Sequence, residues 1–316
     1  MIRILLKNEL YKIMKRKKIY IFIILTIIVC ALQTVISYKY DDSKKLDWKG
    51  SAEAQIEYAK EYCEQYAAEK NSEDYKEVEK QQILAEYVLD NNLSSMYIRT
   101  YWKSVFDSLE LMIIITIMTI ILCCDIFCED YSLRTIKLLF TRPNKRRDIW
   151  ISKLLSTIII FLVMSFVLMV TSIIINMFLY NCLESRQSII YLNDYGKIVE
   201  KSYFVYLLQN YLTIFVEAVG YILLTAVCSV LFKNSSIATT ISVVGLFGSS
   251  IVISIYEQKI ELLKYSLFYN IDLSQYLNCG GNYWETTILF SVLIIVLHYL
   301  LFFLVGNQVY CKQEIY

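Results

Sequence analysis

Long apolar runs alternate with charged segments along this chain of 316 residues. Four runs carry no charge at all: 19–38, 154–183, 234–256 and 286–311. Two further runs, 105–127 and 203–232, contain only a few acidic residues. Each run is long enough to cross a hydrocarbon core of about 30 Å as a helix of about 20 residues. Because backbone amides need internal partners in lipid, we predict an all-α membrane protein with six transmembrane helices, in preference to a soluble helical protein.

Basic residues predict the orientation. Seven Lys and Arg precede the first run, and seven lie between the second and the third. Such residues accumulate on the cytoplasmic side, so we expect a protein of the cell membrane with both termini in the cytoplasm. The segment 39–104 holds ten basic and fourteen acidic residues, but long loops translocate largely regardless of charge, and we place it outside. The net charge of +1 argues against nucleic acid as a partner.

The runs and this orientation predict how the chain is organised. Residues 1–18 should form an amphipathic helix at the membrane interface, because their apolar side chains fall on one helical face. The other expected segments are transmembrane helices at 19–38, 105–128, 149–183, 203–232, 234–256 and 286–308, an extracellular insertion at 39–104, a cytoplasmic segment at 129–148, outer loops at 184–202 and 257–285, and a cytoplasmic tail at 309–316.

The insertion at 39–104 is polar, rich in tyrosine and nearly free of glycine. Ser51 is a candidate N-cap for a first helix, and Ser72 would begin a second helix that ends at Asn91 and Asn92. The pair predicts an extracellular helical hairpin with arms of about 28 Å. Two roles stay open, a spacer that packs on the other outer loops and a gate for a substrate.

Two features concern the last spans. The outer loop 257–285 is too apolar for an ordinary solvated loop, so we expect it to return into the outer leaflet as short re-entrant helices. In the fifth span, Ala238, Ser242, Gly245 and Ser249 form a ridge of small side chains suited to close helix packing. This ridge is either an intramolecular seam or part of a dimer interface.

The nine cysteines follow no metal-ligand spacing. Cys123, Cys124 and Cys128 are expected to be buried thiols. Cys182 and Cys279 are candidates for one external disulfide, which no spacing supports. A single histidine, with no metal cluster and no nucleophile elbow, argues against an enzyme.

The segment between the second and third spans is the most informative part of the chain. Leu133, Ile136 and Phe140 fall at helical spacing, which predicts a short amphipathic helix on the membrane surface. Pro143, the single proline, follows where this helix must stop. The basic cluster from Arg142 to Arg147 is either an orientation signal or a docking site for anionic lipid or an acidic partner.

With these residues the chain resembles the ABC type-2 exporter permeases. That family typically has an acidic residue, three further residues, Gly-Thr, apolar positions, Pro, Arg, and a Lys that begins the third span. The matching residues here are Asp130, Thr135, Lys137, Leu138, Leu139, Pro143, Arg146 or Arg147, and Lys153. Arg134 stands where the family usually has Gly, so a more regular helix is expected at this position. The resemblance also covers the basic N-terminal helix, the polar break at 233–236, the loop before the last span, and the tail at 310–315.

The resemblance implies the membrane subunit of an ATP-driven exporter. The helix at 130–142 would be a cytoplasmic coupling helix seated against a separate ATPase subunit. No phosphate-binding loop occurs in the chain, so ATP and Mg would be held by the partner ATPase, with no cofactor in this chain. A second permease copy or a paralogue would complete the assembly in the lipid bilayer. The implied ATPase-coupling residues are Leu133, Ile136, Lys137, Phe140, Arg142 and Arg146.

Polar residues inside spans are costly and mark candidate functional sites. Glu217 and Asn210 share a stripe of the fourth span, His298 lies near the middle of the sixth, and Asp107 and Glu110 lie near the outer end of the second. All five are candidates for the translocation path. Other interpretations stay open: a Glu217–His298 pair, a histidine that is simply packed, and interfacial carboxylates that reach for water.

The leading hypothesis is a permease that moves a hydrophobic or amphipathic substrate, such as an antimicrobial peptide, a lipid or a drug, when ATP binding rocks the two membrane halves. The alternative is a membrane sensor or peptide-immunity protein that binds an extracellular ligand through 39–104 without transport.

Overall fold

The computed structural model of the protein describes residues 2–41, 47–66, 73–94, 97–136, 144–180, 188–192, 197–256, 259–277 and 286–313. Within these residues, six helices are long and apolar enough to cross a membrane. The protein is therefore a multi-pass membrane protein with an all-α membrane part, as the apolar runs predicted.

The six candidate spans follow the predicted runs closely. The fourth has its predicted bounds, whereas the third begins three residues earlier than predicted and ends at Leu179. The second is one apolar stretch with a short 3-10 turn near its start. The spans are α2 (Lys17–Lys39), α5 (Tyr101–Asp107) with η4 (Ser108–Leu111) and α6 (Met112–Ser132), α8 (Arg146–Leu179), α9 (Tyr203–Phe232), α10 (Ser235–Tyr256) and α12 (Ile288–Lys312).

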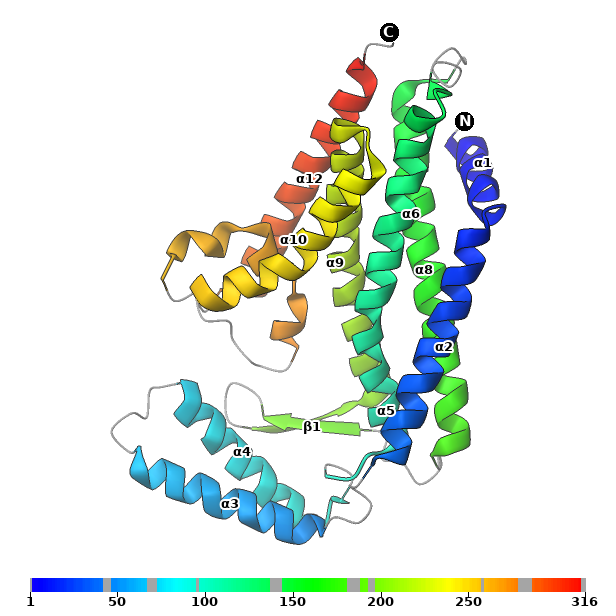
Figure 1. The fold of residues 1–316 in the computed structure, drawn as a ribbon. Coiled ribbons are helices and arrows are strands. Elements are labelled where there is room, and N and C mark those ends of the chain that lie inside the picture. Colours follow the sequence, from blue (N-terminus) through cyan, green and yellow to red (C-terminus); the bar gives the residue numbers. More distant parts are fainter. Residues whose placement is uncertain are drawn as a thin grey trace.

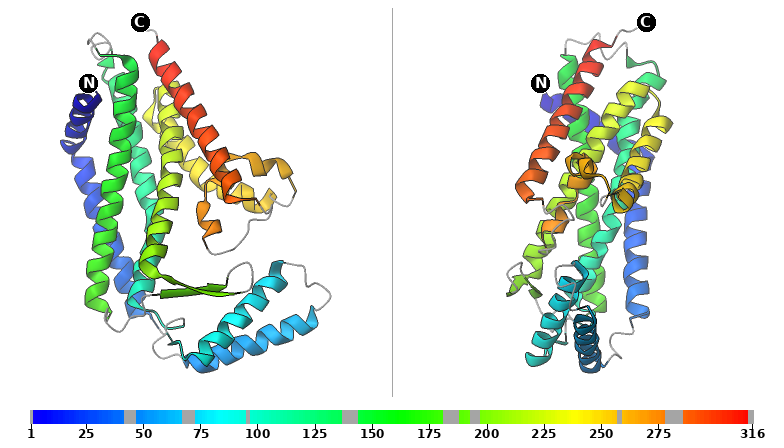
Figure 2. Two further views of the ribbon diagram at one scale, coloured as in Figure 1. Left: turned by 180° about the vertical axis from the view of Figure 1, so that it is seen from behind. Right: turned by 90° about the vertical axis from the view of Figure 1, so that its left-hand side faces the viewer.

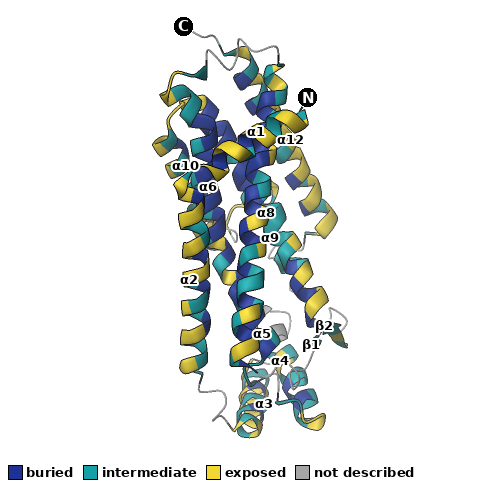
Figure 3. Cartoon of the chain, turned by 90° about the vertical axis from the view of Figure 1, so that its right-hand side faces the viewer, coloured by how far each residue is buried: buried dark blue, intermediate teal, exposed yellow. Residues whose placement is uncertain are grey.

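The spans form one bundle with α6 and α9 at its centre (Figure 1). α2, α10 and α12 lie at the periphery, and their outward faces carry exposed apolar side chains, as lipid contact requires (Figure 3). Both chain termini lie at one end of the bundle, here called the terminal end (Figure 2). The opposite end, here called the hairpin end, carries α3 (Trp48–Gln65) and α4 (Glu73–Asp90).

Aromatic packing fills the core at the terminal end. Trp150 of α8 is fully buried, with its ring 4.9 Å from Phe127 of α6 and 5.7 Å from Tyr310 of α12. Gly306 of α12 gives the indole room, since a Cβ there would lie 2.4 Å from Trp150 Cζ2. The short N-terminal helix α1 (Ile2–Met14) packs beside α8 and adds Ile13 to the same core.

The helices α3 and α4 pack side by side at the hairpin end. The prediction that Ser51 caps the first of them is wrong, because α3 begins at Trp48 and the Ser51 hydroxyl donates to the Asp47 carbonyl at 3.0 Å from inside the helix. α4 ends at Asp90 and is followed by Asn91 and by Asn92, which has a left-handed φ of 55°. Asparagine tolerates this conformation better than most residues.

A β-hairpin stands outside the all-α membrane part. The segment 184–202 was expected to be a plain outer loop, but β1 (Ser188–Leu192) and β2 (Ile198–Ser202) pair as antiparallel strands, with Ile190 opposite Glu200. β1 lies beside α4 and the start of α9 (Figure 1). The apolar and β-branched residues on both strands favour this pairing.

The segment between α10 and α12 contains η5 (Glu261–Tyr265), α11 (Leu267–Asn270) and η6 (Leu273–Tyr276). Leu267, Ile271 and Leu273 are buried in one cluster with Tyr221 of α9. Ile271 lies against Gly220, where an added Cβ would come within 2.7 Å of its side chain. The short helices therefore reach the level of Gly220, close to the midpoint of α9.

The ridge on α10 is an intramolecular seam. Ala238 and Ser242 are fully buried, and Thr225 of α9 donates a hydrogen bond of 2.9 Å to the Ser242 hydroxyl. Gly245 faces Leu224, whose methyl carbon would lie 3.6 Å from an added Cβ. Ala238 and Ser242 therefore belong to an intramolecular seam.

The described cysteines are free thiols, and Cys123, Cys124 and Cys128 are buried as predicted. The candidate disulfide between Cys182 and Cys279 lies outside the described residues.

Candidate functional site

A pocket of about 380 Å³ lies between the central helices and the short helices that precede α12. It draws on α5, η4, α9, α10, α11 and η6, and we call it the carboxylate pocket. Its walls combine acidic, hydroxyl, amide and aromatic side chains with apolar ones. The lining residues are Phe106, Asp107, Leu109, Glu110, Asn210, Ile214, Glu217, Tyr221, Ser249, Ser250, Phe268, Ile271, Asp272 and Ser274.

One stripe of α9 forms the inner wall of the carboxylate pocket. Asn210, Ile214, Glu217 and Tyr221 follow one another at spacings of four, three and four residues, so they share one helical face. The Asn210 amide donates to the Tyr206 carbonyl at 2.9 Å. The carboxylate of Glu217 makes no hydrogen bond or ion pair with any residue that the structure describes.

The other carboxylates of the pocket differ in their partners. Asp107 forms an ion pair with Arg99. Asp272 accepts hydrogen bonds from the amide and the hydroxyl of Ser274, at 2.9 and 2.6 Å. Glu110 is exposed at the rim. The pocket thus holds more negative than positive charge, and Glu217 is the carboxylate set deepest along a span.

Aromatic rings complete the walls. Tyr221 and Phe268 lie with their ring centroids 6.4 Å apart and their planes tilted by 30°. Phe106 stacks on Tyr206 at 5.0 Å. The Tyr221 hydroxyl lies 3.5 Å from the Ser249 hydroxyl across the boundary of α9 and α10. Carboxylates beside aromatic faces suit a cation, because both attract positive charge.

The structure brings together four of the five residues predicted for a translocation path: Asp107, Glu110, Asn210 and Glu217. His298 does not line the pocket, and its Nδ1 donates to the Ile294 carbonyl at 2.8 Å within α12. The Glu217–His298 pair is therefore absent from the described residues. The next residue, Tyr299, faces α9 instead and donates to the Val216 carbonyl at 2.5 Å.

A second polar cluster lies at the terminal end. Lys153 of α8 is 1% exposed, and its ammonium group donates to Asp130 and to the Ile126 carbonyl, both at 2.5 Å. Thr135 donates to the other carboxylate oxygen of Asp130 at 3.4 Å. Three residues on which the permease resemblance was based, Asp130, Thr135 and Lys153, thus meet around the buried lysine, across the break between α6 and α8.

Arg134 corrects an expectation. We expected a more regular helix here than in permeases with Gly, but α6 ends at Ser132 and Arg134 adopts a left-handed φ of 55°. The chain turns sharply at this position. The Arg134 side chain is exposed, so arginine pays the steric cost of the left-handed backbone but no additional packing cost.

The turn at Arg134 also separates two of the predicted coupling residues. Leu133 is 63% exposed, whereas Ile136 packs against the core, so the two do not share one helical face as predicted. Arg146 donates to the carbonyls of Cys311 and Gln313, at 2.8 and 3.0 Å. The remaining predicted coupling residues, Lys137, Phe140 and Arg142, lie outside the described residues.

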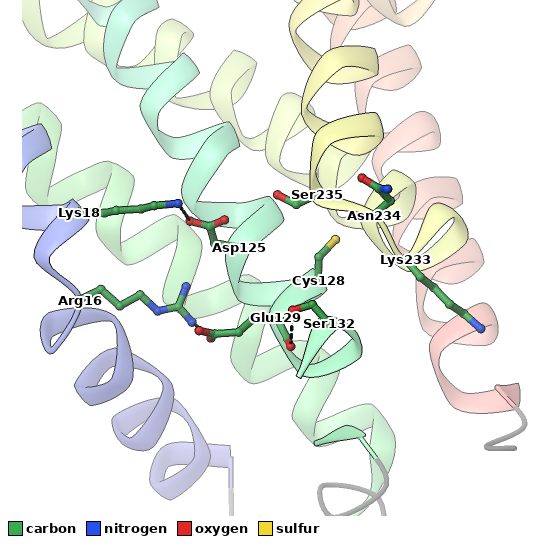
Figure 4. A pocket seen from close by; sticks show the side chains of 9 residues that line it. All are labelled: Arg16, Lys18, Asp125, Cys128, Glu129, Ser132, Lys233, Asn234 and Ser235. Atoms are coloured by element: carbon green, nitrogen blue, oxygen red, sulfur yellow. Dashed lines mark hydrogen bonds and ion pairs between the residues drawn. The ribbon is translucent and has the colours of Figure 1, made fainter. Parts of the chain in front are cut away.

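A further pocket of about 510 Å³ opens at the terminal end between the α1–α2 junction, α6 and the α9–α10 turn (Figure 4). Arg16 pairs with Glu129, and Lys18 pairs with Asp125 at 2.8 Å. Lys233 stands on the other wall, and its side chain extends away from these pairs (Figure 4). Because Glu129 and Asp125 already have charge partners within the protein, we interpret this pocket as a packing boundary between helices and not as a binding site.

Sequence reasoning missed three residues of the carboxylate pocket that matter for its chemistry: Asp272, Tyr221 and Phe268. Asp272 stands in an apolar loop whose path could not be foreseen. Tyr221 could have been found, since it lies one helical turn beyond Glu217 on the same face. Among the residues that the structure describes, no group of His, Cys, Asp and Glu is arranged to hold a metal ion.

Comparison with known proteins defines the family. The family model described as "Protein of unknown function (DUF2705)" matches residues 78–316. The chain belongs to this family. The match begins within α4 and includes both the carboxylate pocket and the Asp130–Lys153 pair.

Two relatives come from Bacillus subtilis (strain 168). "Uncharacterized protein YhcI" is 26% identical over 313 residues, which is 98% of each chain. "Uncharacterized membrane protein YdbK" is 26% identical over 210 residues, or 65% of this chain and 80% of the relative. The membrane character in the second name agrees with the six apolar helices found here.

Proposed function

We propose that this chain is the permease subunit of an ATP-driven exporter of the ABC type-2 class. It would work with separate ATPase subunits and a second permease copy or paralogue in the cell membrane. Its terminal end, with both termini, would face the cytoplasm, and its hairpin end would face outside. ATP and Mg would belong to the ATPase partner, and the chain itself would catalyse no reaction.

The arrangement around Asp130 carries this proposal. Asp130, Thr135 and Lys153 all match the permease pattern, and the three side chains meet in one cluster around the buried Lys153. Between them Arg134 takes the left-handed conformation that glycine favours, at the position where that family usually has Gly. A left-handed residue at the position where the permease pattern has Gly supports the resemblance beyond residue identities alone.

The exposed Leu133 next to this cluster is the described residue best placed to meet an ATPase. A push on the segment after α6 would reach the bundle along two routes, through the Asp130–Lys153 pair into α8 and through Arg146 into the end of α12. Those contacts link the proposed coupling region to three spans, which is what a rocking motion of the membrane half requires.

The carboxylate pocket would be part of the translocation path. It lies between the midpoint of α9 and the hairpin end, and four predicted path residues line it. If the bundle spans a bilayer, this level falls within the outer half of the membrane. The short helices from η5 to η6 would then be re-entrant, because they pack at the level of Gly220.

One observation favours the second candidate, a membrane sensor or peptide-immunity protein without transport. Exposed carboxylates at Glu53, Glu57, Glu61 and Glu64 line one groove on α3, at spacings that place them on one face of the helix. A hairpin with this face could hold a basic peptide outside the cell. In that case no ATPase would be needed.

The deciding experiment is purification together with an ATPase. Co-expression with candidate ABC ATPase subunits from the same genome should yield a stable complex that hydrolyses ATP in the membrane. Leu133→Asp should weaken this complex, since it places charge at the proposed contact without touching the core. Ile136 is unsuited to this test, because it packs against the core and its replacement would also destabilise the fold.

Tyr58→Asp is the matched control. Tyr58 is 60% exposed, nearly as much as Leu133, but it lies on α3 at the other end of the molecule. It should leave the ATPase complex intact. Equal ATPase binding by wild type and Leu133→Asp would remove the coupling assignment, and absence of any ATPase partner would favour the sensor.

A further inference from the structure

We propose that the carboxylate pocket binds organic cations that carry an apolar or aromatic body, with Glu217 as the charge partner. That these cations are the substrates of an exporter rests on the proposed function. Cation binding itself can be measured without transport. The inference goes beyond a hydrophobic or amphipathic substrate, because it fixes the sign of the charge.

The size and composition of the cavity suit a small organic ligand. Its volume of about 380 Å³ falls within the range of small-molecule sites, roughly 300–1,000 Å³. Leu109, Ile214 and Ile271 supply apolar wall on three sides, from η4, α9 and the segment after α11. Such walls favour a ligand that brings apolar surface with it, and they disfavour a hydrated inorganic ion.

Glu217 lies at the midpoint of the spanning helix α9. A carboxylate in the middle of a spanning helix is costly unless it is paired, protonated or in contact with water. Asp107 and Asp272 have partners within the protein, and Glu217 has none among the described residues. Glu217 therefore has a vacant place for a positive group on the pocket side, and binding a cation there would remove the cost of leaving the charge unpaired.

Aromatic side chains line the carboxylate pocket together with Glu217. Tyr221 lies one helical turn from Glu217, and the ring of Phe268 faces Tyr221 at 6.4 Å. A cation held at the Glu217 carboxylate would lie near these ring faces, which attract positive charge within about 6 Å. An anion of the same shape would meet repulsion from both the carboxylates and the rings, so the pocket distinguishes charge more strongly than shape.

The test uses two ions of nearly equal size and shape and opposite charge, tetraphenylphosphonium and tetraphenylborate. Each is titrated into the full-length chain purified in detergent, with empty micelles as the blank. Tetraphenylphosphonium should bind and raise the melting temperature, because a ligand that prefers the folded state stabilises it. Tetraphenylborate should bind at least about tenfold more weakly.

Variants assign the binding to the pocket. Glu217→Gln should keep the fold and weaken tetraphenylphosphonium binding by about tenfold or more. Phe268→Leu should weaken it by a smaller factor while retaining the preference for the cation. Glu129→Gln removes the same charge at the terminal end and should leave binding unchanged, which controls for the net charge of the protein.

Three results would overturn the inference: equal affinity for the two ions, unchanged cation binding by a folded Glu217→Gln variant, and displacement of the probe by an equal concentration of Ca²⁺. The proposed function fails separately. Cation binding that depends on Glu217, in a chain that assembles with no ATPase, would retain the site and reject the exporter. A functional ATPase complex whose permease shows no charge preference would do the reverse.

Discussion

Lys153 and Asp130 form an ion pair inside the bundle, with 2.5 Å between Nζ and Oδ2 and a lysine side chain that is 1% exposed. The same ammonium donates to the Ile126 carbonyl, so one buried lysine holds both a side chain and the backbone of α6. The contact ties the start of α8 to the end of α6.

The first prediction concerns this pair. Lys153→Met should destabilise the protein by about 3 kcal/mol, because it leaves the largely covered Asp130 carboxylate without its counter-charge. The double variant Asp130→Leu with Lys153→Met should recover much of that loss, since an apolar pair needs no desolvation of charge. Thermal melting in detergent compares the wild type, Lys153→Met, Asp130→Leu and the double variant. A double variant whose loss equals the sum of the two single losses would contradict the assignment.

The second prediction concerns Gly306. Gly306→Ala should cost about 1–3 kcal/mol by overpacking, because its Cβ would lie 2.4 Å from Trp150 Cζ2. Adding Trp150→Phe should restore part of the loss by shortening the ring. Gly248→Ala is the matched control, since the nearest side-chain atom to its Cβ is 3.8 Å away. That control should be neutral or slightly stabilising, and a loss equal to that of Gly306→Ala would argue against the steric explanation.

The third prediction concerns Arg134. Arg134→Gly should raise stability by up to about 1 kcal/mol, because glycine adopts a left-handed φ without the steric cost of a side chain. Arg134→Ala removes the side chain but keeps the Cβ, so its melting temperature should match that of the wild type. If alanine and glycine raised the melting temperature equally, the gain would come from the lost charge, and the backbone argument would not stand.

The fourth prediction tests the proposed orientation. In variants with a single cysteine, a membrane-impermeant thiol reagent added to intact cells should label Cys63 on α3 and leave Cys311 near the end of α12 unlabelled. Both thiols are free and partly exposed in the structure, so accessibility does not favour one over the other. Permeabilised cells provide the control, in which both should react. Labelling of Cys311 from outside would reverse the orientation.

The six spans could be predicted because a transmembrane helix is recognisable from its local sequence, by its length and its lack of charged residues. Four of the five path candidates also met in one pocket, since a polar residue inside a span must face protein or water. His298 is the exception, because its ring donates a hydrogen bond to the Ile294 carbonyl one turn away in the same helix. A local hydrogen bond of this kind leaves no mark in the sequence pattern.

The rest depended on tertiary contacts. Asp272 entered the pocket only because Ile271 and Leu273 bury the surrounding segment against α9 and α12. The proposed common face of Leu133 and Ile136 failed because one left-handed residue between them redirects the chain. The β-hairpin was overlooked because a short strand of mixed apolar residues does not differ by periodicity from an apolar loop.

The turn between α9 and α10 consists of Lys233 and Asn234 alone, and the Asn234 side chain accepts from the amides of Ser236 and Ile237. From that turn onward, the seam of Ala238, Ser242 and Gly245 holds the two helices together. Two helices joined by so short a turn and packed at three successive small residues would move together over this stretch. We then expect a ligand to enter the carboxylate pocket by movement of its other walls, the short helices after α10 or the 3-10 turn beside Asp107.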